Sequence, residues 1–63
     1  MDLDVVGLLK KFLFTHKGSF SAEDVRDYLK SNQEKAYLED IERFLSESDY
    51  VIPLIDKKYI TRI

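Results

Sequence analysis

Apolar side chains recur at helical spacing in three separate stretches of this 63-residue chain. In residues 4–16 and again in 34–46 they fall three or four positions apart, which places them on one face of a helix. A shorter stretch between Ser21 and Ser31 shows the same spacing. The positions expected to be buried are Val5, Leu8, Leu9, Phe12, Leu13, Ala22, Val25, Tyr28, Leu29, Tyr37, Leu38, Ile41, Phe44 and Leu45.

Glycine and small polar residues mark where these helices begin and end. Gly18 follows the first stretch, where helices often close with a left-handed residue. Ser21 is the expected N-cap of the second helix, and Asp24 stands three positions later in a near-capping-box arrangement. Ser31–Gln33 is typical of a turn. The pattern therefore predicts helices over about 4–16, from the Ser21 cap to this turn, and over about 34–46.

Two further runs, Tyr50–Ile55 and Lys58–Ile63, are rich in β-branched and aromatic residues and are separated by Asp56–Lys57. This pattern predicts a β-hairpin. Pro53 has no N–H to donate, so that side of its strand should face a sheet edge or a bulge. Ser19–Phe20 is expected to form a short first strand. The predicted fold class is α+β, in the order helix, strand, helix, helix, strand, strand.

Two segments carry a resemblance to a known superfamily. The segment His-Lys-Gly-Ser-Phe-Ser-Ala-Glu-Asp-Val-Arg-Asp-Tyr-Leu at 16–29 and the closing Lys-Tyr-Ile-Thr at 58–61 resemble the winged helix-turn-helix superfamily. The chain looks like a small N-terminal accessory winged-helix domain, and the resemblance implies a three-helix bundle with an antiparallel hairpin wing. It also implies that the third helix would enter a DNA major groove while the wing follows the backbone. The groove-facing positions would be Asn32, Gln33, Lys35, Ala36, Glu39, Asp40 and Arg43.

Length and composition indicate one small domain. We expect residues 1–63 to form a single winged-helix domain taken from a longer protein, because the chain stops inside a predicted strand. Without cysteine there is no disulfide framework, which makes a cytoplasmic or nuclear location the default. No apolar run approaches the roughly 20 residues of a membrane helix. Neither a metal-loop nor a phosphate-loop motif is present, so we expect no cofactor, no metal and no catalysis.

Charge is distributed unevenly along the chain. Residues 21–49 carry nine acidic and four basic groups, whereas residues 50–63 carry three basic groups and one acidic. The leading hypothesis is a recognition module, accessory to a transcription or RNA-processing protein, that contacts a DNA or RNA backbone weakly through the wing and the end of the first helix. Its candidate nucleic-acid-binding residues are Lys10, Lys11, Lys17, Lys57, Lys58, Tyr59 and Arg62.

The acidic third helix supports an alternative. From 34 to 47 it carries five acids against Lys35 and Arg43, which would repel phosphates from a major-groove surface. Such a face could instead dock on a basic protein partner or mediate self-association, as could an exposed sheet edge. The candidate protein-interaction residues are Glu34, Glu39, Asp40, Glu42 and Glu47. His16, the only histidine, is expected to interact with the C-terminal end of the first helix rather than to act as a base.

Overall fold

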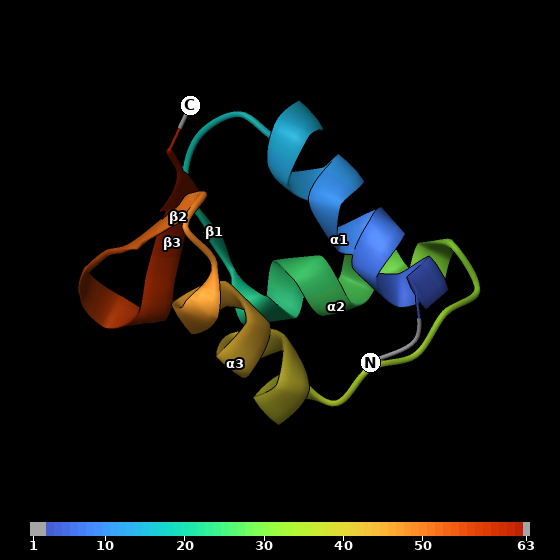
Figure 1. Cartoon of the computed structure of the whole chain (residues 1–63). Helices are drawn as coiled ribbons and strands as arrows, with labels where there is room; N and C mark the ends of the chain where they lie inside the picture. The colour runs from blue at the N-terminus through green and yellow to red at the C-terminus, as the bar shows by residue number, and fades with distance from the viewer. Residues whose placement is uncertain (1–2, 63) are drawn as a thin grey trace.

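A computed structural model describes residues 3–62, and within this range the chain forms three α-helices and a three-stranded antiparallel sheet (Figure 1). The elements follow the predicted order, and the layout is compatible with a winged helix. Ile63, the last residue of the second predicted hairpin strand, lies outside the described residues. In chain order the elements are α1 (Leu3–Thr15), β1 (Phe20–Ser21), α2 (Ala22–Ser31), α3 (Leu38–Glu47), β2 (Val51–Pro53) and β3 (Lys58–Thr61).

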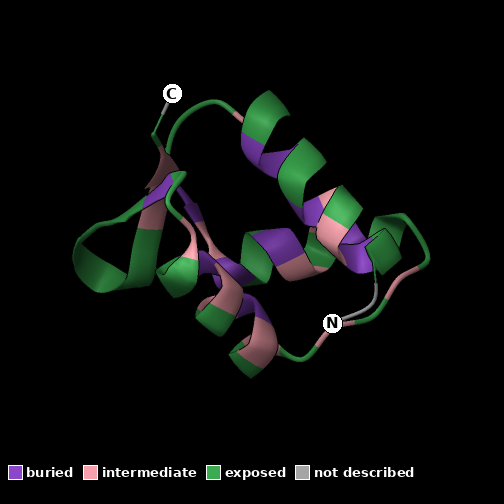
Figure 2. Cartoon of the chain, in the orientation of Figure 1, coloured by how far each residue is buried: buried purple, intermediate pink, exposed green. Residues whose placement is uncertain are grey.

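One apolar core joins the helices to the sheet. α2 packs against both α1 and α3, so the inward sides of all three helices meet around it (Figure 2). Four more of the predicted positions, Leu8, Tyr28, Leu38 and Phe44, are half-buried at the edge of this core. The fully buried residues are Val5, Leu9, Phe12, Leu13, Phe20, Ala22, Val25, Leu29, Ile41, Leu45 and Val51.

α2 begins at the predicted capping box. Asp24 N–H donates to Ser21 Oγ at 3.3 Å, and Ser21 N–H donates back to Asp24 Oδ2 at 2.9 Å. These bonds satisfy two backbone donors that a helix N-terminus leaves free. Gly18, in the loop that leads from α1 to β1, has a φ of 88°, which confirms the predicted left-handed residue after the first helix.

α3 begins at Leu38, four residues later than predicted. α2 closes in a Schellman arrangement: Gln33 N–H donates to Lys30 O at 3.0 Å and Glu34 N–H donates to Leu29 O at 2.9 Å. Gln33 is left-handed at φ 61°, and the chain then runs extended to Tyr37 at ψ 144°. The prediction that Tyr37 is buried is wrong, because this residue precedes α3 and its side chain is 81% exposed. The spacing of apolar residues did not reveal that Tyr37 lies outside the helix, because Tyr37 stands directly before Leu38, the first residue of the apolar stripe of α3.

β3 is the central strand of the sheet, with β1 on one side and β2 on the other. In this register Phe20 faces Tyr59, Ile52 faces Ile60 and Pro53 faces Tyr59. Arg62 N–H donates to Tyr50 O, and Leu54 N–H donates to Lys58 O, both at 2.7 Å. β2 is shorter than the predicted run, because regular pairing ends at Pro53.

The hairpin closes through a single 3-10 turn over Ile55–Lys57, at the predicted position. Lys58 N–H donates to Ile55 O, and the two residues between them, Asp56 and Lys57, have φ values of 62° and 58°. Two successive left-handed residues match the right-handed twist of the flanking strands, which is why such turns close tight hairpins. This turn forms the tip of the hairpin, far from α1 (Figure 1).

Candidate interaction surface

The six basic candidate residues are all exposed, but they spread over two parts of the molecule. Lys10 and Lys11 lie on α1 and Lys17 in the loop after it, while the other three belong to the hairpin. The end of α1 does meet the base of the hairpin: the Phe14 and Tyr50 rings lie 5.9 Å apart between centroids. The remaining basic candidates are Lys57 at the hairpin tip, Lys58 at the start of β3 and Arg62 just after its end.

Strand alternation sorts the hairpin side chains onto two faces. Val51, Tyr59 and Phe20 face the core, as their burial shows. Because neighbouring residues of a strand point to opposite faces, Ile52 and its partner Ile60 lie on the outer face. Together with the tip and the base of the hairpin they make up a surface that we call the hairpin face. It comprises Tyr50, Ile52, Leu54, Ile55, Lys57, Lys58, Ile60 and Arg62.

The hairpin face is unusually apolar for an exposed surface. Ile52 is 42% exposed, Leu54 is 44% and Ile55 at the tip is 84%. Tyr50 is 53% exposed, and Phe14 of α1, itself 60% exposed, extends the apolar surface from the base of the hairpin. The apolar residues of this face lie between basic residues, with Lys58 paired to Leu54 and Arg62 paired to Tyr50. This part of the hairpin is mostly green in Figure 2.

Tyr59 is separated from the basic residues with which it was grouped by sequence. Its ring stacks on Phe20 at 6.1 Å with an interplanar angle of 28°, and Phe20 is completely buried. Lys58 is one residue and Arg62 three residues from Tyr59 along the chain. In extended backbone an odd separation places side chains on opposite faces, so Lys58 and Arg62 point away from Tyr59, to the other face of the sheet. Tyr59 is therefore a neighbour of Lys58 and Arg62 in sequence, but its side chain lies on the other face of the sheet.

The acidic candidates gather on α3 and in the link before it. α3 carries Glu39, Asp40, Glu42 and Glu47 against Arg43, which leaves a net charge of −3 over Leu38–Glu47. The Asp40–Arg43 pair is loose, at 3.9 Å between Oδ1 and Nη1, and exposed, so it neutralises little of this charge. Glu39 and Asp40 occupy the first turn, the part of a recognition helix that would approach base edges.

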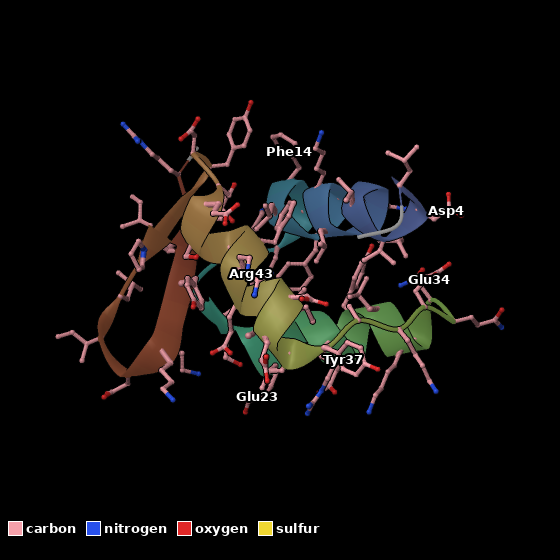
Figure 3. All side chains as sticks on the ribbon, turned by 60° about the horizontal axis from the view of Figure 1, so that its bottom comes forward. Asp4, Phe14, Glu23, Glu34, Tyr37 and Arg43 are labelled. Atoms are coloured by element: carbon pink, nitrogen blue, oxygen red, sulfur yellow. The ribbon has the colours of Figure 1, made fainter. Side chains whose placement is uncertain are left out.

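The predicted groove-facing positions do not share one helical face. Asn32, Gln33, Lys35 and Ala36 lie in the link between α2 and α3, whereas Glu39, Asp40 and Arg43 lie on α3 itself. Figure 3 shows Glu34 and Tyr37 along this link and Arg43 on the helix that follows. The late start of α3 therefore splits the set that the winged-helix resemblance had grouped together.

Shallow hollows follow α3 on its side toward α1. A hollow of about 500 Å³ is lined at the N-terminal end of α3 by Val5, Glu34, Tyr37 and Asp40 among others. A second, of about 300 Å³, lies between Lys10 and Leu13 of α1 and Phe44 and Glu47 of α3, and Tyr50 at the base of the hairpin also lines it. A third, of about 220 Å³, joins them along α3 and shares Asp40 with the first and Phe44 and Glu47 with the second. The rims carry both signs of charge, so these hollows favour no charged ligand.

The His16 ring packs on two aromatic residues of the core. Its ring stacks on Phe12 at 4.8 Å and meets the edge of Phe20 at 5.6 Å, while Nε2 lies 3.3 Å from Ser19 O. Nearby, the pKa of Asp24 is lowered below its ordinary value of 3.8, first by the hydrogen bond from Ser21 N–H and further by the positive charge of Lys58. Within residues 3–62 no cluster of three or more His, Cys, Asp or Glu side chains could hold a metal ion.

The free edge of β2 is a poor template for an added strand. Hydrogen-bonded pairs alternate in an antiparallel ladder, so bonding at Tyr50 and Leu54 directs the backbone of Val51 and Pro53 outward. Val51 N–H already lies 3.5 Å from Ser48 O, and Pro53 has no N–H. The prediction that Pro53 lies at an edge is confirmed, and the same geometry removes this edge from the candidate docking sites.

Comparisons with known proteins add no assignment: no protein-family model, curated protein or solved structure matches the chain. Across the described residues no helix is long and apolar enough to cross a membrane.

The aliphatic residues of the hairpin face, Ile52, Leu54, Ile55 and Ile60, were absent from the candidate sites predicted by sequence. They could have been found, because Tyr50–Ile55 is apolar or proline at every position, on both faces of the predicted strand. A strand with one solvated face ordinarily alternates between apolar and polar residues, and an unbroken apolar run is typical of a strand covered on both sides. The core of the domain covers one face of this run, and the other face is exposed at Ile52 and Leu54.

Proposed function

We propose that this chain is a non-catalytic recognition domain of winged-helix type that docks on a partner protein through its hairpin face. The observation that carries the proposal is the exposure of Ile52 and Leu54 on a strand that is apolar on both faces. Contiguous exposed apolar surface rimmed by polar residues is characteristic of protein interaction sites. Aromatic residues and arginine are also enriched at such interfaces, and Tyr50 and Arg62 lie at the base of this face.

The charge of α3 supports docking over DNA reading. Phosphate contacts supply most of the affinity of DNA-binding domains, and a helix with a net charge of −3 repels phosphates. The basic residues of the hairpin face do not form a continuous stripe, because Ile52, Leu54 and Ile60 lie between them. A phosphate backbone gains nothing from covering these apolar side chains, whereas a protein partner does.

A second candidate function is contact with a nucleic-acid backbone through the hairpin. The specific observation in its favour is that Lys57, Lys58 and Arg62 are all exposed on one hairpin. About three phosphate contacts would give weak binding that falls steeply with salt. This candidate leaves the exposed apolar side chains without a role, which is why we rank it below docking.

Site-specific photocrosslinking in the source cells tests the proposal. The full-length protein would carry p-benzoylphenylalanine in place of Tyr50, on the hairpin face, or in place of Tyr37, an exposed tyrosine in the α2–α3 link. We expect a discrete protein adduct from position 50 that is absent from position 37. The adduct should disappear in an Ile52→Lys, Leu54→Lys background, whose exposed substitutions leave the core intact.

The same experiment separates the two candidate functions. Equal adducts from both positions, or none from position 50, would contradict docking through the hairpin face. An adduct at position 50 that nuclease removes would favour nucleic acid instead. An amide NMR titration with a short duplex then decides: salt-sensitive shifts at Lys57, Lys58 and Arg62 would support backbone contacts, and an unshifted spectrum would leave docking in place.

A further inference from the structure

We infer that the partner segment is amphipathic and acidic, with carboxylates placed to meet both ends of an apolar stripe. This inference rests on the proposed docking function and adds the chemistry of the occupant. The hairpin face has Lys58 beside Leu54 at one end, Arg62 beside Tyr50 at the other, and the Ile52–Ile60 pair between them. Basic residues therefore lie at the two ends of the Ile52–Ile60 apolar surface.

Strand geometry fixes the spacing that the partner must match. Lys58 begins β3 and Arg62 comes directly after its end, so the two are four residues apart, which is about 13 Å at roughly 3.3 Å per extended residue. A helical partner rises about 1.5 Å and turns about 100° per residue, so carboxylates seven or eight positions apart lie on one side of the helix, about 11–12 Å apart, and would reach both basic groups. Apolar residues between them, on the same side of the helix, would cover Ile52 and Ile60.

The charge balance of the hairpin favours an acidic occupant. Residues 50–63 carry Lys57, Lys58 and Arg62 against Asp56, and the field of Lys58 also reaches Asp24 of α2. Partly desolvated basic groups at an interface gain from opposing carboxylates, and like charges in those positions oppose binding. An acidic segment is therefore attracted where a basic one is excluded.

A second copy of this chain does not meet these requirements. Two hairpin faces packed together would oppose their basic residues. The acidic α3 of another copy offers the right charge, but its exposed positions, including Glu39, Arg43 and Ser46, are polar and cannot cover Ile52 or Leu54. Addition of a partner strand at β2 is also disfavoured, because Pro53 and Val51 offer no free N–H at that edge. The occupant is therefore a different chain that binds with its side chains.

Designed peptides test this chemistry without knowledge of the natural partner. The probe is a helical peptide of about 16 residues, roughly 24 Å long, with a leucine stripe and two glutamates eight positions apart. Matched peptides carry glutamine or lysine at both glutamate positions. Binding to the full chain is followed by amide NMR, with Ile52, Leu54 and Ile60 as reporters of the hairpin face.

We expect the glutamate peptide to shift these reporters and to bind at least about tenfold more tightly than the lysine peptide. A Lys58→Glu, Arg62→Glu double variant should reverse this order, whereas Lys11→Glu, an exposed charge reversal on α1, should leave it unchanged. Reversal of preference is informative because a variant that merely unfolds would bind neither peptide. Unchanged amide dispersion in both variants completes the control.

The outcomes distinguish the two levels of the proposal. If all three peptides shift the hairpin reporters with equal affinity, docking stands and the inference of an acidic partner is wrong. If the lysine peptide binds the native protein more tightly, the same conclusion follows. If shifts fall on α3 and not on the hairpin face, the proposed docking surface is itself wrong.

Discussion

Replacement of Gln33 by glycine should stabilise the domain, because this residue occupies the left-handed position that closes α2. Its φ is 61°, and the flanking hydrogen bonds, from Gln33 N–H to Lys30 O and from Glu34 N–H to Leu29 O, hold it there. A residue with a Cβ pays roughly 1–2 kcal/mol for this conformation, and glycine avoids that cost. The greater freedom of glycine in the unfolded chain offsets about 0.4–1 kcal/mol of the gain.

The net stabilisation expected from Gln33→Gly is therefore about 0.5–1 kcal/mol. For a domain of this size that corresponds to a rise in Tm of roughly 2–8 °C. Urea and thermal unfolding followed by far-UV circular dichroism measure both quantities. Since the Gln33 side chain is exposed, its removal loses no core packing.

The control is Gln33→Ala, which also removes the side chain but keeps the Cβ. This variant should match the native protein or fall slightly below it. If Gln33→Gly is no more stable than the native chain, or if alanine gives the same gain as glycine, then the left-handed closure of α2 is not the source of strain. The start of α3 at Leu38 would then need another explanation.

Three further predictions concern the helices. Gly7→Ala should stabilise the domain by about 1 kcal/mol in urea unfolding, because Gly7 lies inside α1 and an added Cβ would meet no atom within 4 Å; a loss of stability would show that α1 is not a regular helix there. Phe12→Ala should cost roughly 3–5 kcal/mol and leave most of the chain unfolded by circular dichroism, because the ring is buried against Phe20 and Tyr28; a folded variant would show that α1 is not packed as described. Folding lowers the pKa of Asp24, so the stability that its carboxylate contributes is fully present above pH 3.8 and is lost as the pH falls through the lowered pKa. The difference in the free energy of unfolding between the native chain and Asp24→Asn should therefore shrink in acid. A difference that does not change with pH would contradict the capping bond.

The helices were predictable where their determinants are local. The apolar stripe of α1 and the Ser21–Asp24 capping box lie within a few residues of each other, and both were found from the sequence with boundaries accurate to about one residue. The start of α3 was missed for an equally local reason. Gln33 adopts a left-handed conformation that favours glycine, and the local closing bonds to Lys30 O and Leu29 O hold it there, so the residue type gave no sign that α2 ends here.

The interaction surface was harder to predict because it depends on contacts distant in sequence. The meeting of Phe14 and Tyr50 joins residues 36 positions apart, and periodicity carries no information about such pairs. The separation of Tyr59 from Lys58 and Arg62, in contrast, follows from strand alternation alone once the strand is recognised. Sequence analysis grouped Tyr59 with Lys58 and Arg62 by charge and proximity, but the alternation of side chains along the strand places Tyr59 on the opposite face.

The blunted edge of β2 also bears on the solubility of the domain. An exposed apolar strand with free backbone donors is a template for stacking one molecule on the next, and such strands seed fibrils. Here the apolar side chains of Ile52 and Leu54 are displayed on a strand whose outward N–H groups are missing at Pro53 and occupied at Val51. The exposed apolar side chains therefore lie on an edge with few free backbone donors, which disfavours edge-to-edge stacking of one molecule on the next. Substitution of Pro53 would restore an outward N–H at this edge, so we expect it to cause aggregation before any effect on folding or recognition.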